Sequence, residues 1–223
     1  VDAGGLTVNS VVTANGSGDV TLNADTGTVT LAALVSSTTG DIAVTGDVVT
    51  QNAGITTGVA GTVTVTADAG NVTMANLTTT TSGTGTIAYS ATGDVALSRL
   101  TSTSGNLNVT ADSDTNGTGA ITDNTALETA NLITTGIATL VAAQGIGAAA
   151  AADIDTTIGT LVATNSTTGN IFIQETSGLI IAGTGVRTLA GSGNINVDVD
   201  AGGLTVNSVV TANGSGDVTL NAD

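Results

Sequence analysis

Regularly spaced aspartates are the residues of this chain that could do chemistry. An acidic side chain stands seven residues after a glycine at Asp25, Asp47, Asp68, Asp112, Asp200 and Asp223, and threonine takes this place at Thr92 and Thr176. Carboxylates and turn carbonyls are suitable calcium ligands, so stacked copies of this position could form a Ca²⁺ ladder. Aspartate is also a common turn residue that stays solvated, and this simpler interpretation is the one we favour. We assign no catalytic, cofactor-binding or metal-ligating residue from the sequence.

The groups that most enzymes use are missing from the sequence. The 223 residues include no His, Cys or Lys, and the only basic residues are Arg99 and Arg187. Without His and Cys the commonest general base and the thiolate nucleophile are absent, so we expect no catalysis. Eighteen acidic residues give a net charge of −16. This charge argues against binding to nucleic acid and against direct contact with an anionic membrane.

The composition predicts an all-β chain with a narrow core. Hydrophobic residues make up 40% of the sequence but aromatic residues only 1%, so aliphatic side chains must fill the interior. Val, Ile and Thr favour strands, while the 31 glycines supply turns. Pro is absent, which suits strands that are paired on both edges.

A short motif recurs in which glycine and a polar residue precede an apolar–any–apolar triplet. One series of these glycines, with steps of 20–24 residues, is Gly18, Gly40, Gly61, Gly85 and Gly105, followed after a 64-residue gap by Gly169, Gly193 and Gly216. We interpret the gap as three more steps of the same column. A second series contains Gly27, Gly70 and Gly93, with the strand at 46–49 between the first two. Each turn of about 22 residues therefore carries two such strands and has room for a third.

This period predicts a parallel β-helix, or β-solenoid, in which each layer stacks on the one before it. The apolar positions of the motif would point inward at Val20 and Leu22, Ile42 and Val44, Val63 and Val65, Ile87 and Tyr89, Leu107 and Val109, Ile171 and Ile173, and Ile195 and Val197. The residues between them would face solvent: Thr21, Ala43, Thr64, Ala88, Asn108, Phe172 and Asn196. A string of immunoglobulin-like sandwiches fits less well, because these domains repeat near 100 residues and usually need a core aromatic.

Residues 112–160 are the least regular part of this pattern. The segments at 125–132 and 148–152 could form a short helix or a tight layer of small residues. We interpret the region as β-solenoid with local irregularity.

The first 25 residues recur unchanged as residues 199–223. We therefore treat 1–198 as one tandem repeat unit and 199–223 as the start of the next, joined without a linker. About nine turns of about 22 residues would fill one unit, so that each copy begins at the same phase of the solenoid. In such an array Asp200, Asp25, Asp47 and Asp68 of adjoining copies would stack in four successive layers.

The segment LVAAQGIGAAAAADIDTTIGTLVATNSTTGNIFIQETSGLIIAG at 140–183 resembles the shaft repeats of filamentous-haemagglutinin-like, β-strand-repeat giant bacterial surface proteins. The resemblance implies a right-handed parallel β-helix, secretion, and a place in a cell-surface or extracellular fibre. The function we expect is thus a structural repeat of a long fibre, stalk or sheath. Its partner would be itself, through tandem copies stacked end to end and through lateral bundling of fibres. The alternative is an adhesin shaft whose surface binds carbohydrate or neighbouring fibres.

Overall fold

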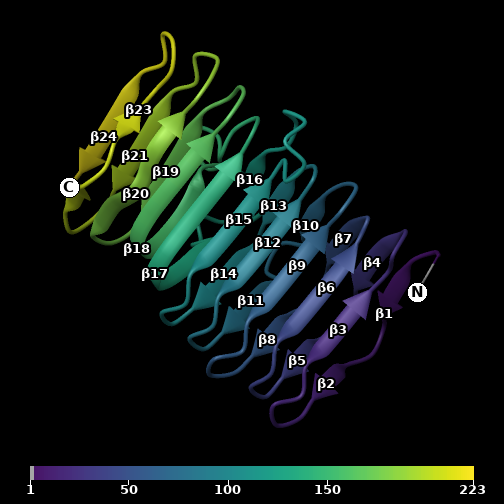
Figure 1. The fold of residues 1–223 in the computed structure, drawn as a ribbon. Coiled ribbons are helices and arrows are strands. Elements are labelled where there is room, and N and C mark those ends of the chain that lie inside the picture. Colours follow the sequence, from purple (N-terminus) through teal and green to yellow (C-terminus); the bar gives the residue numbers. More distant parts are fainter. Residues whose placement is uncertain (1–2) are drawn as a thin grey trace.

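The computed structural model describes residues 3–223, and within this range the chain is an all-β solenoid without a helix (Figure 1). Parallel strands stack in about nine turns of about 23 residues, which confirms the predicted fold class. Each turn has three sides, which we call faces A, B and C in chain order. The three faces together form two hydrogen-bonded sheets of 6 and 18 strands.

The first half of the solenoid has one short strand per face in every turn. Face A starts with β1 (Leu6–Val8), β4 (Thr28–Leu31), β7 (Val48–Gln51), β10 (Val72–Met74), β13 (Val95–Leu97) and β16 (Ile121–Asp123). Face B starts with β2 (Val12–Ala14), β5 (Val35–Ser37), β8 (Ile55–Thr57), β11 (Thr79–Ser82) and β14 (Arg99–Ser102). Face C starts with β3 (Val20–Asn23), β6 (Ile42–Gly46), β9 (Val63–Ala67), β12 (Ile87–Ala91) and β15 (Leu107–Ala111).

In the second half, three long strands run around the corner from face B to face C. They are β17 (Leu132–Ala142), β18 (Ile154–Asn165) and β20 (Leu179–Thr188). Face A continues through single bridges from Ile121 to Ile146 and from Ile146 to Ile171, and then through β19 (Ile171–Glu175), β21 (Ile195–Val199) and β24 (Val218–Ala222). The last strands on faces B and C, β22 (Leu204–Val206) and β23 (Val210–Thr211), both pair with β20.

Aliphatic side chains fill the interior of the solenoid. Of the residues predicted to point inward, all are buried except Leu22, which lies in an end layer and packs partly buried against the core. None of the residues predicted to face outward is buried. The alternation holds because adjacent layers pair in register, for example Ile42 with Val63 and Val63 with Ile87. A two-residue period is therefore copied from layer to layer.

The glycine that opens each motif is required by close stacking. A Cβ added at Gly85 would overlap the carbonyl oxygen of Gly61 in the layer before it, and one at Gly193 would overlap that of Gly169. The polar residue after the glycine accepts a backbone hydrogen bond from the next layer: Asp41 accepts one from the N–H of Thr62 at 2.7 Å. That bond lowers the pKa of Asp41. The Gly–Asp and Gly–Asn pairs are thus contacts between layers as well as turn residues.

A second polar ladder closes the corner between faces B and C. A hydroxyl at the end of the face-B strands β5, β8, β11 and β14 donates to a glycine carbonyl of the preceding layer, as Ser37 does to Gly18 at 2.7 Å and Ser82 to Gly61 at 2.7 Å. Thr134 makes the same bond to Gly105. Because these side chains lie inside the solenoid, they satisfy carbonyls that water does not reach.

Tyr89 crosses the interior and joins all three faces. Its hydroxyl donates to Oε1 of Gln51 on face A at 2.6 Å and lies 2.6 Å from Oγ1 of Thr80 on face B. The amide nitrogen of Gln51 completes the triangle with Thr80 at 3.0 Å. Burial raises the pKa of Tyr89 above its ordinary value. The triangle satisfies three buried polar groups, so each depends on the other two.

The predicted continuation of the first glycine series is wrong. The strands after Gly18, Gly40, Gly61, Gly85 and Gly105 lie on face C, whereas those after Gly169, Gly193 and Gly216 lie on face A. Face C continues after β15 through the second halves of β17 and β18. The gap from Gly105 to Gly169 therefore holds two turns and one further face. Its turns are longer because residues 112–120, 124–131 and 147–153 form loops outside the strands.

These loops also bear on two other expectations. The two segments at 125–132 and 148–152 contain bends and turns and no helix, which agrees with the interpretation of this region as β-solenoid with local irregularity. The identical 25-residue copies do not return to the same phase: β1, β2 and β3 lie on faces A, B and C, while their copies β22, β23 and β24 lie on faces B, C and A. From β1 to β22 the chain makes eight full turns and advances one further face.

Candidate metal centre

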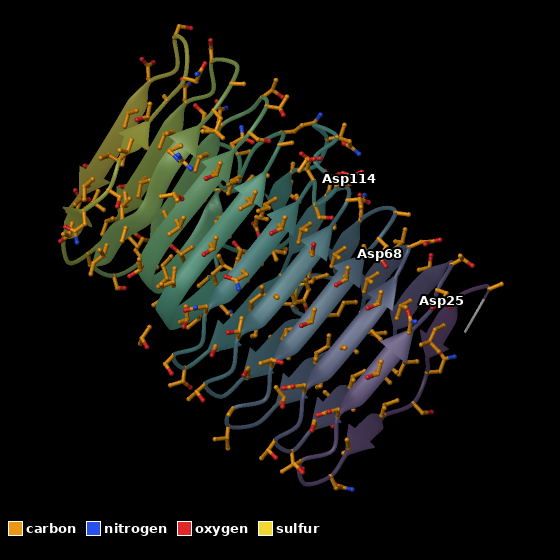
Figure 2. The ribbon with its side chains drawn as sticks, in the orientation of Figure 1. Asp25, Asp68 and Asp114 are labelled. Atoms are coloured by element: carbon orange, nitrogen blue, oxygen red, sulfur yellow. The ribbon has the colours of Figure 1, made fainter. Side chains whose placement is uncertain are left out.

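The regularly spaced aspartates lie on the outside of the solenoid. Figure 2 shows Asp25 and Asp68 along one edge of the stack, with Asp114 further along the same edge. Asp25 and Asp68 are exposed, and Asp25 accepts a hydrogen bond from the side chain of Asn23 at 2.6 Å. Asp112 is 8% exposed and accepts the N–H of Gly117. These contacts are those expected of turn residues.

A different set of carboxylates converges in the irregular region. Within residues 3–223, Glu128, Asp153 and Asp155 are the only three acidic residues whose side-chain oxygens all lie within 4.8 Å of one another. We call them the acidic trio. Glu128 comes from the loop 124–131, Asp153 from the loop 147–153, and Asp155 from the start of β18. None of the three belongs to the spaced series that the sequence singled out.

Asp155 is buried although it points away from the core. Its neighbours Ile154 and Thr156 pair with the buried residues Ile173 and Glu175 and face inward, so Asp155 faces outward. The residues predicted to face outward on the other strands are half-buried or exposed, but Asp155 is only 5% exposed. The surrounding loops therefore cover this part of face A.

Asn131 holds the first loop against β18. Its side-chain oxygen accepts the N–H of Asp155 at 3.0 Å, and its own N–H donates to the carbonyl of Asp155 at 2.8 Å. The side-chain nitrogen of Asn131 donates to Asp123 at 2.7 Å. The second loop closes on itself through a bond from the N–H of Asp153 to the carbonyl of Ala150, at 3.1 Å. The first loop is thus anchored to Asp155, and the second ends in a turn that directly precedes β18.

The electrostatics of the acidic trio are those of unpaired charges. Burial, followed by the charge of Glu128, raises the pKa of Asp153 to about 6. Burial, followed by the charge of Asp153, raises the pKa of Asp155 to about 7. Every charged neighbour that acts on Asp155 is another carboxylate: Asp153, Glu128, Asp123 and Asp200. The arrangement can therefore hold either protons or a cation.

The sequence prediction missed this site because its members come from three segments. Only tertiary folding brings residue 128 to residues 153 and 155. One signal was available, since Asp123, Glu128, Asp153 and Asp155 concentrate negative charge in the stretch where the strand pattern fails. That concentration does not say which of the four side chains meet.

A shallow groove crosses the corner between faces B and C over four layers. It is lined by segments 101–103, 133–135, 157–159 and 177–178, which consist of Thr, Ser, Ile and Gly residues. Hydroxyls bridge its layers, for instance Thr135 to the carbonyl of Thr103 at 2.9 Å and Thr157 to Thr176 at 2.6 Å. The outward aromatic Phe172 does not line this groove and is half-buried.

Comparisons with known proteins add no relative to this description. No family model, curated protein or solved structure matches the chain. Within the described residues, no helix is long and apolar enough to cross a membrane.

Proposed function

We propose that this chain is a shaft segment of a long extracellular or cell-surface fibre of the kind that the filamentous-haemagglutinin-like resemblance suggests. The observation that supports the proposal most directly is the pairing between the two copies of the repeated sequence. β21 pairs with β24 in five consecutive positions, and four of these pairs, from Ile195 with Val218 to Asp198 with Asn221, join a residue of the first unit to a residue of the next. A second unit thus adds to the first through the same ladder that joins layers within a unit.

Such a shaft carries load through its backbone. Tension along the axis would act on many parallel hydrogen bonds at once, while the aliphatic interior keeps water away from the layers. Each unit adds about 40 Å, from its eight and a third layers at about 4.8 Å per layer. Because each copy starts one face further on, any feature of the unit would appear on faces A, B and C in turn.

Recombinant arrays of two, three and four units test the proposal. We expect rods in electron microscopy and small-angle scattering whose length grows by about 40 Å per unit. A label on one loop would return to the same side only every third unit, about 120 Å along the rod. Compact particles, or beads whose spacing does not follow unit number, would contradict a continuous shaft.

An adhesive surface is the second candidate function, and the groove lined by 101–103 and 133–135 is the observation that favours it. Threonine and serine hydroxyls can donate and accept hydrogen bonds, which suits a carbohydrate or the side of a neighbouring fibre. Binding of the four-unit array to a glycan panel, compared with a variant carrying Thr135→Val, distinguishes the two candidates. A shaft without adhesive function would bind no glycan in either form.

A further inference from the structure

We propose that the acidic trio of Glu128, Asp153 and Asp155 is a binding site for a divalent cation of the calcium class. The site does not depend on the fibre proposal, since all three residues belong to one unit. Each of the three segments contributes one carboxylate, and their oxygens lie within 4.8 Å of one another. A calcium ion with ligands at about 2.3–2.6 Å places oxygens on opposite sides about 5 Å apart, so one ion can reach all three.

The burial of Asp155 is the independent observation that points to a ligand. Its side chain is 5% exposed and offers an oxygen within 4.8 Å of oxygens of Glu128 and Asp153. Within residues 3–223, the hydrogen bonds between Asp155 and Asn131 use the backbone N–H and carbonyl of Asp155 and not its carboxylate. Oδ1 of Asp153 is also buried without a partner. Buried carboxylates are normally paired with a cation or bound by donors. Glu175 illustrates the usual solution, because four donors from Thr156, Ile158 and Ser177 satisfy its buried carboxylate.

The ligand chemistry selects the class of ion. All three ligands are carboxylate oxygens, and the chain contains no Cys or His that would favour zinc or copper. Two of the ligands stand on loops that can adjust, and calcium tolerates such flexible geometry better than magnesium, which demands a near-ideal octahedron. Calcium is therefore the expected ion and magnesium the weaker competitor.

A bound ion would hold the two loops against the solenoid. The loops 124–131 and 147–153 lack the parallel ladder that fixes the rest of the chain, and one carboxylate from each meets Asp155 on β18. The ion would replace the mutual repulsion of three carboxylates by attraction to a common centre. The same loops lengthen the turns that shift the phase of the repeat, so the ion would stabilise the part of the unit that sets the rotation.

Calcium titration of the full 223-residue chain tests the proposal. After treatment with EDTA, we expect one calcium ion per chain by isothermal titration calorimetry at pH 7.5 in 0.1 M KCl. The salt screens diffuse binding to the acidic surface. At 100 times the dissociation constant, calcium should raise the melting temperature by about 5–10 °C. Magnesium at the same concentration should raise it less.

Three substitutions separate this site from the general negative charge. Asp155→Asn should raise the melting temperature of the calcium-free chain, because it removes a buried charge, and should abolish the shift that calcium produces. Glu128→Gln should raise the melting temperature of the calcium-free chain less than Asp155→Asn does, because Glu128 is exposed and only its repulsion of the two aspartates is removed, and it should weaken calcium binding at least tenfold. Asp68→Asn is the matched control: it removes one exposed charge outside the site and should bind calcium like the parent chain.

Two results would overturn the proposal. If the parent chain and the Asp155→Asn variant respond equally to calcium, the ion binds elsewhere. If calcium has no effect at pH 7.5 while the calcium-free chain is more stable at pH 5 than at pH 8, the trio holds protons instead of a cation. A stable Asp155→Asn variant keeps both comparisons interpretable, since its folding is measured without calcium.

Discussion

The regular layers from β5 to β15 and the irregular region 112–160 solve the same packing problem in different ways. In the regular layers every turn is short, and the strands pair in register with those of the adjacent layers. In the irregular region the strands keep their aliphatic interior, with Leu132, Leu140 and Leu161 fully buried, but the loops between them are long. The contrast shows that additional residues are accommodated in loops between the strands, where they do not interrupt the hydrogen-bonded ladder or the aliphatic core. The extra chain then shifts the phase of the solenoid and buries charge on its outer surface.

The largest effect should come from breaking a regular layer at its glycine. Gly85→Ala forces a Cβ onto the carbonyl oxygen of Gly61. Because the atoms that this Cβ meets belong to the backbone of the preceding layer, they cannot move aside as a side chain would. We expect a loss of about 3 kcal/mol in the free energy of unfolding, measured by urea denaturation. Gly203→Ala is the control, because a Cβ there meets nothing within 4 Å. Equal losses for the two substitutions would mean that stacking does not explain the glycine series.

The irregular region should show its difference in the pH dependence of stability. The pKa values of Asp153 and Asp155 are raised to about 6 and about 7, so in this window the folded chain binds more protons than the unfolded chain. Stability of the calcium-free chain should therefore fall as pH rises from 5 to 8. The two pKa values alone would give about 4 kcal/mol, and screening by solvent reduces the expected loss to about 2 kcal/mol. The carboxylates that act on the pair are Glu128 on its loop, Asp123 on β16, Asp198 on β21, and Asp200 after β21.

Urea denaturation in EDTA at pH 5 and pH 8 measures this effect. Asp155→Asn should flatten the profile, whereas Asp68→Asn should leave it as steep as in the parent chain. A profile that remains equally steep in Asp155→Asn would assign the dependence to the net charge of −16 instead.

A smaller effect is expected from the polar triangle inside the regular layers. Tyr89→Phe removes the hydroxyl that serves Gln51 and Thr80, leaving buried polar groups unsatisfied at a cost of about 1–3 kcal/mol. Adding Gln51→Leu and Thr80→Val should recover most of the loss, because no buried polar group then lacks a partner. Failure of the triple variant to recover would indicate that the shape of Tyr89, and not the triangle, determines the stability.

The smallest effect should come from one exposed link between layers. Asp41→Ala removes the acceptor for the N–H of Thr62, and we expect a loss of under about 1 kcal/mol at pH 7. Asp41→Asn keeps an acceptor oxygen and should lose less. Because the pKa of Asp41 is lowered, its contribution is present above pH 4 and lost as pH falls through the folded-state pKa. A larger loss for Asn than for Ala at pH 7 would contradict this assignment.

Much of this fold could be predicted from short stretches of sequence. Pairs such as Ile87 and Tyr89 point inward because a strand alternates with a period of two, and this information is local. The offset of 20–24 residues then predicted which strands stack within residues 18–111. The structure confirms both of these predictions. The motif specifies a strand and its inward side, but it does not specify whether that strand lies on face A, B or C. The strand after Gly85 was placed correctly because the spacing between layers is regular there, whereas the strand after Gly169 was placed on the wrong face because long loops precede it.

The sequence by itself determined the strands, their buried sides and the aliphatic interior, because each depends on residues within a few positions or one layer. Only the tertiary structure decided how many turns the loops consume and hence on which face the second copy of β1 begins. It also decided that Glu128, Asp153 and Asp155 meet. Both results depend on where the chain leaves the ladder and how it folds back. That path is set by contacts such as Asn131 with Asp123, which lie 8 residues apart in the sequence and are not related by the period of one turn.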